Sequence, residues 1–97
     1  MIAGGRDSAM LRLTLARILA QEKQLAAAIA HLESAVRLDP AYTAAWKELG
    51  RLQLAEERHE AALAAWEKGI EVARLNGDKQ AEKEMTVFAK RLRKEAR

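Results

Sequence analysis

The chain has 97 residues, with 17 lysines and arginines against 14 acids, a net charge of +3 and no cysteine. This length allows one domain with a thin core and leaves no room for a second, catalytic domain. The absence of cysteine excludes disulfides and thiolate zinc sites and favours a reducing compartment, so we expect a cytoplasmic protein. Residues 1–7 lack the hydrophobic stretch of a signal peptide, and no apolar run is long enough for a membrane span.

The first predicted element is a helical hairpin. Asp7 and Ser8 are both good N-cap residues, so we expect a helix to begin there. Apolar residues then recur at spacings of three and four, which predicts one packing face: Leu11, Leu15, Ile18 and Leu19. The pattern lapses at 21–24, which predicts a turn, and resumes in a second helix. Pro40 prevents that helix from continuing, because proline lacks an amide and restricts the residue before it.

A second hairpin and a fifth helix follow. The third helix is predicted from about Thr43 and the fourth from about Arg58, and Asn76-Gly77-Asp78 supplies a helix stop and a new N-cap. The fifth helix has an apolar stripe of Ala81, Met85, Phe88 and Leu92. No alternating strand pattern of useful length occurs in the sequence. The sequence therefore predicts an all-α fold of about five helices arranged as antiparallel hairpins.

The two hairpins are copies of one another at a repeat period of about 34 residues. A shift by this period places Leu15 on Leu49 and Ala28 on Ala62. The second copy reads Trp46-x-x-Leu49-Gly50 in its first helix and Ala62-x-x-x-Trp66 in its second. This period, with these large and small residues in a helix–turn–helix, resembles the tetratricopeptide repeat family.

The resemblance covers roughly residues 7–74 and implies an α-α superhelix. It divides the chain into a flexible N-terminus and three structured units, with bounds of 1–7, then 8–41 (repeat 1), 42–76 (repeat 2) and 78–97 (capping helix). The first copy departs from the family motif, because Arg12 stands where the tryptophan would be and Leu19 where a tyrosine would be. Two repeats and a cap are few for this architecture, which leaves self-association or a longer repeat array open.

In function, the resemblance implies a non-enzymatic module that binds a peptide or helix of a partner protein. First helices of successive repeats line a concave groove in this family, and carried over by position the groove residues are Leu13, Arg17, Lys47, Arg51 and Leu54. Cationic and apolar groups together suit a segment with acidic and hydrophobic residues, although the cations alone would also fit an ordinary solvated face. The family's clamp for a C-terminal carboxylate is disfavoured, because Leu13, Arg17 and Glu48 replace its lysine and asparagines.

The sequence contains no catalytic, cofactor or metal motif. His31 and His59 lie on different predicted helices, and neither has a histidine at i+4, so they lack metal-ligand spacing. Gly4-Gly5 is isolated and forms no phosphate-binding loop. We therefore predict no enzyme activity, no cofactor and no metal. Trp46 and Trp66 stand at the family's packing positions, which favours a core role over a ligand cage.

Two other functions remain open. Residues 1–78 hold ten cations against eleven acids, whereas 79–97 hold seven against three, so the basic surplus lies in the last helix. Its segment Lys90-Arg91-Leu92-Arg93-Lys94 could contact phosphates of a nucleic acid or an anionic surface. Nucleic acid is the less favoured partner, because the segment has no aromatic residue to stack on bases and a helix dipole alone favours cations there. A structural homodimer would pair an exposed stripe of the first helix, Met10 and Leu13.

Overall fold

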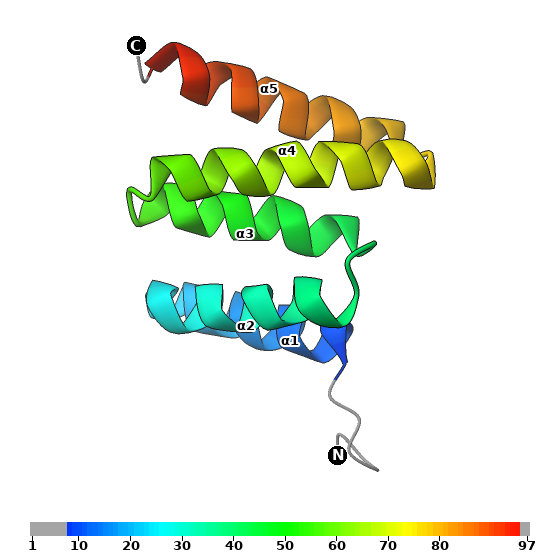
Figure 1. Ribbon diagram of the computed structural model, residues 1–97. Coiled ribbons are helices and arrows are strands. Elements are labelled where there is room, and N and C mark those ends of the chain that lie inside the picture. Colours follow the sequence, from blue (N-terminus) through cyan, green and yellow to red (C-terminus); the bar gives the residue numbers. More distant parts are fainter. Residues whose placement is uncertain (1–7, 96–97) are drawn as a thin grey trace.

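The computed structural model describes residues 8–95 (Figure 1). Asp7 and the predicted flexible N-terminus, 1–7, lie outside this range, as do residues 96–97. Five helices follow in chain order: α1 (Ala9–Gln21), α2 (Leu25–Leu38), α3 (Thr43–Ala55), α4 (His59–Asn76) and α5 (Lys79–Glu95). Between residues 8 and 95 the chain forms no strand. The prediction of an all-α fold with about five helices is confirmed.

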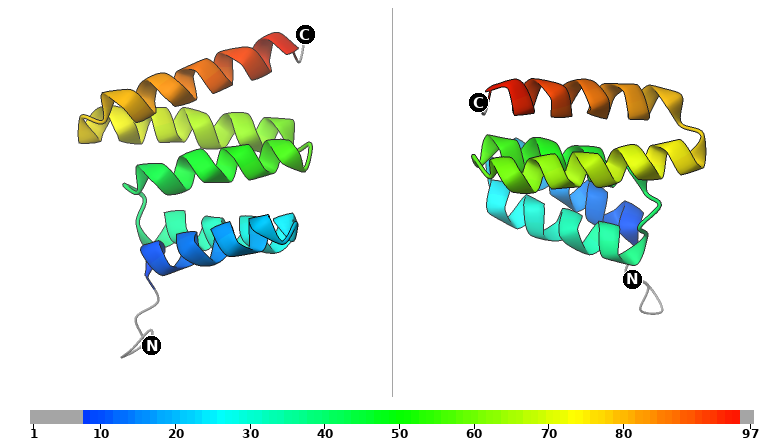
Figure 2. Two further views of the ribbon diagram at one scale, coloured as in Figure 1. Left: turned by 180° about the vertical axis from the view of Figure 1, so that it is seen from behind. Right: turned by 45° about the horizontal axis from the view of Figure 1, so that its top comes forward.

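The helices form a stack of antiparallel pairs. α1 packs against α2, α3 against α4, and α5 lies along α4 (Figure 1). The two pairs meet mainly where α3 packs on α2, so α1 and α2 make one end of the stack and α5 makes the other (Figures 1 and 2). α3 also contacts both α1 and α5, which brings the first helices of the two hairpins and the final helix to a common side.

The repeat period of the sequence recurs in the backbone of the turns. Lys23 and Glu57, which are one period apart, adopt left-handed φ angles of 64° and 60°. After each of them the chain makes the same hydrogen bond back to the helix: the amide of Gln24 donates to Leu19 at 2.9 Å, and the amide of Arg58 donates to Gln53 at 2.8 Å. These bonds satisfy carbonyl groups left over at the helix ends, so both hairpins turn in the same way.

The helix ends follow from local side-chain chemistry. Ser8 Oγ accepts a hydrogen bond from the amide of Leu11 at 3.0 Å, which confirms the predicted N-cap of α1. α4 ends at Gly77, whose φ of 73° is the left-handed conformation that glycine adopts without a Cβ clash. Asp78 Oδ1 then accepts from the amide of Ala81 at 3.1 Å and caps α5. The predicted stop and new N-cap are therefore both present.

Small residues allow close helix contacts in the core. Ala28 and Ala62 are both fully buried. A Cβ atom placed on Gly50 would lie 2.6 Å from both Cδ1 and Cε2 of Trp66, so the indole of α4 packs directly on the backbone of α3. One at Gly69 would lie 2.5 Å from the sulfur of Met85, so α5 approaches α4 in the same manner. Small residues at these positions therefore allow the helices to approach closely.

α1 packs through a different face from the one predicted. Leu11, Leu15 and Ile18 are 36%, 36% and 48% exposed, whereas Leu13 and Ala16 are buried with exposures of 3% and 1%. The predicted packing face of α1 is therefore wrong at Leu11, Leu15 and Ile18, whereas Leu19 packs partly buried against the core. Leu13 is not part of an exposed stripe with Met10. The physical reason is that no helix of the described residues precedes α1, so the side of α1 that would meet a preceding hairpin has nothing to pack against.

Candidate binding groove

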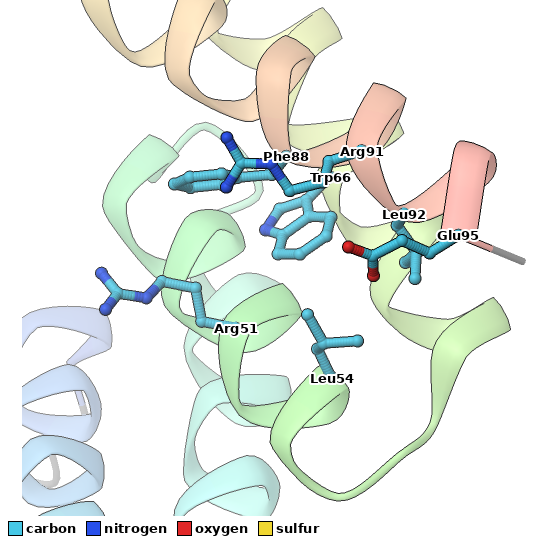
Figure 3. Close-up of a pocket in the computed structure, with 7 residues that line it drawn as sticks. All are labelled: Arg51, Leu54, Trp66, Phe88, Arg91, Leu92 and Glu95. Atoms are coloured by element: carbon cyan, nitrogen blue, oxygen red, sulfur yellow. The ribbon is translucent and has the colours of Figure 1, made fainter.

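A pocket of about 350 Å³ opens where α3, α4 and α5 meet, and we call it the α3–α5 groove (Figure 3). Seven residues line it: Arg51, Leu54, Trp66, Phe88, Arg91, Leu92 and Glu95. Its size lies at the lower end of the range of about 300–1,000 Å³ that is common for ligand pockets. The groove is therefore large enough for one or two side chains of a partner.

The floor of the groove is aromatic and held in place by contacts on several sides. Trp66 is 2% exposed, and its indole N–H donates to the backbone carbonyl of Lys47 at 3.3 Å. The ring of Phe88 lies 5.3 Å from it between centroids, at an interplanar angle of 47°, a favourable tilted arrangement. Because Gly50 has no side chain, the indole also rests on the α3 backbone. The predicted core role of Trp66 agrees with this burial, and part of the indole also reaches the groove.

The rim of the groove carries charge. Arg51 projects from α3, Arg91 lies beside the Phe88 ring, and the Glu95 carboxylate is turned towards the Trp66 side of the groove (Figure 3). Both arginines are exposed, and neither lies within 4.0 Å of an acidic group in residues 8–95, although the charge of Arg51 contributes to lowering the pKa of Glu84. Two guanidinium groups against one carboxylate leave an excess positive charge, which favours an anionic ligand group.

The five residues predicted for a groove do not share one pocket. Arg51 and Leu54 lie together in the α3–α5 groove. Leu13 and Arg17 border a separate hollow of about 230 Å³ between α1, α2 and α3, where Leu13 is almost fully buried. Arg17 Nη2 is 3.8 Å from a carboxylate oxygen of Glu48, so α1 and α3 are neighbours as predicted, but the charge of Arg17 already faces an acid.

Lys47 is directed to α5 rather than to an open surface. Its Nζ lies 3.0 Å from Oε1 of Glu84, and only about a quarter of its side chain is exposed. The hydrogen bond and charge of Lys47 hold the pKa of Glu84 below its ordinary value, against a smaller opposing effect of burial. This ion pair joins α3 to α5 beside the groove, so Lys47 has a structural partner within the chain.

We expect a Lys47→Met variant to raise the pKa of Glu84 towards its ordinary value. The folded pKa lies below that of the unfolded chain, so the pair stabilises the fold at neutral pH, and this contribution is lost as the pH falls through the folded pKa. An NMR titration of the Glu84 side-chain carboxyl measures the change, with Lys68→Met as the control. An equal Glu84 pKa in the parent chain and in Lys47→Met would contradict this assignment.

The surroundings of Trp46, His31 and His59 are typical of structural residues. Trp46 is partly buried, and its indole N–H donates to the Pro40 carbonyl at 2.8 Å. His31 is half-buried with its Nδ1 3.0 Å from the guanidinium of Arg12, and His59 is exposed. Both histidines therefore lie at the boundary or the surface of the fold.

Sequence reasoning missed the contribution of α5 to the groove. Phe88 was expected only as part of a capping stripe, and Arg91 only as part of a basic segment. A signal was present, because Phe88 follows Leu54 by one repeat period and so continues the repeat register at that position. Lys83 and Glu84 concealed it by occupying the positions of the Leu-Gly pair. α5 packs on the second hairpin in the way that the first helix of a further repeat would pack.

Stacked antiparallel helix pairs with a pocket along one side define a helical-repeat protein of the α-α superhelix class. A tetratricopeptide repeat family model matches residues 9–52. The TPR repeat-containing protein PA0015 of Pseudomonas aeruginosa is 44% identical over 92 residues, covering 95% of this chain and 88% of that protein. The chain belongs to the tetratricopeptide repeat family.

Solved structures give the same result. A tetratricopeptide repeat domain protein from Salinibacter ruber superimposes with a TM-score of 0.84 at 27% identity, over 89% of this chain and 87% of that one. Protein BPP2914 from Bordetella parapertussis has a TM-score of 0.82 at 41% identity, over 98% of this chain and 83% of that one. This fold is commonly a protein–protein interaction module and is generally non-enzymatic. None of the helices between residues 8 and 95 has the length and hydrophobicity to cross a membrane.

Proposed function

We propose that this chain is a non-enzymatic interaction module that binds a short segment of a partner protein in the α3–α5 groove. The observation that carries the proposal is the combination of an aromatic floor with two arginines, Arg51 and Arg91, that have no ion pair within residues 8–95. Isolated surface cations are common, but two beside a concave apolar floor form a recognition site with both an apolar and an ionic component.

The chemistry of the groove suggests the kind of segment that fits. Phe88, Leu54 and Leu92 offer apolar surface to an aliphatic or aromatic side chain. Each guanidinium can bind a carboxylate through two parallel hydrogen bonds. We therefore expect the partner segment to carry a large apolar residue with an acidic residue on either side. The seven lining residues include no nucleophile paired with a general base, which supports a binding role over a catalytic one.

A peptide-display selection on the whole chain, followed by affinity measurements, tests this proposal. Selected peptides should share an apolar residue flanked by acids, and the double variant Arg51→Glu, Arg91→Glu should weaken their binding by about 100-fold or more, since each charge-assisted contact contributes about 1.5–3 kcal/mol. The control is Arg37→Glu, Lys83→Glu, which makes the same change of charge outside the groove and should leave affinity within about threefold.

Circular dichroism first confirms that both double variants remain folded. Equal losses of affinity in the two variants would show that only net charge matters and would overturn the groove. Selected peptides without acidic residues would overturn the role proposed for the arginines.

The alternative partner, a nucleic acid or anionic surface, gains no support from the arrangement of α5. Arg93 is 2.6 Å from a carboxylate oxygen of Glu67, and Arg91 lines the groove, so these two cations of the basic segment are not grouped with Lys90 and Lys94. Steeply salt-dependent binding of a polynucleotide that Lys90→Glu, Lys94→Glu abolishes would instead favour this alternative. The cytoplasmic location stays a prediction from the absence of cysteine.

A further inference from the structure

The outward side of α1 carries an aliphatic stripe that no described residue covers. Its members are Leu11, Leu15 and Ile18, which follow one another at i, i+4 and i+7 and are 36%, 36% and 48% exposed. We call this set the α1 stripe. It lies on the opposite side of α1 from Leu13 and Ala16, which pack into the core.

The repeat identifies what kind of surface the α1 stripe is. One repeat period further on, the same positions of α3 hold Ala45, Leu49 and Leu52. Ala45 is fully buried, Leu49 is 4% exposed and Leu52 packs partly buried against the same core cluster, at the junction of α3 with α2. The α1 stripe is therefore a stacking face of the repeat, equivalent to an interface that is filled elsewhere in the same chain.

We infer that a second copy of this chain covers the α1 stripe, with the two α1 helices packed antiparallel about a two-fold axis that passes near Leu15. The three stripe residues are all aliphatic, so two copies bring like surfaces together without burying a charge. A two-fold axis perpendicular to α1 makes the two helices antiparallel, which also opposes their dipoles favourably. The contact pairs two copies of the same stacking face, whereas the α2–α3 junction within the chain pairs faces of two different helices.

The far end of the stack argues against head-to-tail stacking. The outward side of α5 presents Lys83, Lys90 and Lys94, with Val87 as a single apolar residue that is 44% exposed. Placing the α1 stripe of one copy on this side would bury or crowd three ammonium groups. Head-to-tail contacts would also propagate into larger rings or open filaments, whereas a two-fold contact closes at two copies. The two ends of the stack therefore differ in role: α1 associates and α5 stays in solvent.

Sedimentation equilibrium of the whole chain, from low micromolar up to about 1 mM, tests the inference. One helix per copy gives a small interface, so we expect the mass to rise from one chain to two across this range. Leu15→Glu and Ile18→Glu should each keep the mass at one chain, because each would bury a carboxylate at the contact. Val87→Glu makes a similar change at the far end and should dimerise like the parent chain.

Circular dichroism shows whether each variant is folded, and the partial exposure of Leu15 and Ile18 makes either substitution compatible with the fold. A parent chain that stays a single chain at every concentration would overturn the inference. So would dimerisation of Leu15→Glu and Ile18→Glu at the parent's concentration, or growth of the parent chain beyond two copies.

Discussion

Replacing Trp66 with alanine is expected to lower the free energy of unfolding by about 4 kcal/mol. Trp66 is among the largest fully buried side chains, and its ring joins three helices: it rests on Gly50 of α3 and faces Phe88 of α5. A domain of this size has a total stability of only about 5–15 kcal/mol, so the loss removes a large part of it. Urea denaturation followed by circular dichroism measures the change.

Leu75 provides the matched control on the same helix. It is large and apolar but 82% exposed, so Leu75→Ala should change the free energy of unfolding by less than about 0.5 kcal/mol. If Trp66→Ala and Leu75→Ala had similar small effects, Trp66 would not be the packing centre of the second hairpin and α5.

A Gly50→Leu variant is expected to lose about 3 kcal/mol of stability, because a side chain at this position enters the volume of the Trp66 ring. The Trp66 ring is itself enclosed, so the clash has to be relieved by moving α3 away from α4. Ala64→Leu, which adds the same side chain at an exposed position of α4, and Arg51→Glu, at the exposed position next to Gly50, should each cost less than about 0.5 kcal/mol. The same denaturation experiment compares the three.

Equal losses for Gly50→Leu and Ala64→Leu would contradict the close crossing of α3 and α4. The Gly50→Leu variant should also lose affinity for the selected peptides, because the ring of Trp66 forms part of the floor of the α3–α5 groove. Retained affinity would show that the groove tolerates a displacement of this ring.

Helix ends could be predicted from sequence because the chemistry that sets them is local. A serine hydroxyl at Ser8, a missing amide at Pro40 and a missing Cβ at Gly77 act within a few residues of their own position. The internal repeat added the pairing of helices, since each copy of a helix–turn–helix motif folds as an antiparallel pair.

The packing face of α1 could not be predicted in the same way. Leu15 and Leu49 are the same residue at equivalent repeat positions, yet Leu49 is buried and Leu15 is 36% exposed. α1 is apolar on most sides, so its periodicity allows several packing faces, and only the neighbouring elements decide among them. The face of α3 that contains Leu49 packs against α2. The equivalent face of α1 has no neighbouring helix among residues 8–95.

The groove was predicted in part for a related reason. Arg51 and Leu54 were expected in a groove because they share one stripe of a helix that the motif identifies, and both line the α3–α5 groove. Lys47 was predicted on the same stripe of α3, but it forms an ion pair with Glu84, a residue 37 positions away on α5. Contacts of this kind depend on how α5 packs on the second hairpin. The sequence did not reveal this packing, because Lys83 and Glu84 occupy the positions that correspond to Leu49 and Gly50.

The most direct test of the central claim is an NMR titration of the isotope-labelled chain with a display-selected peptide, following the backbone amide shifts. Binding in the α3–α5 groove predicts the largest shift changes around Arg51, Leu54, Phe88 and Arg91, with the indole N–H of Trp66 also affected. Changes confined to the α1 stripe, or to Lys90 and Lys94 on the other side of α5, would contradict the claim and move the partner to a different surface.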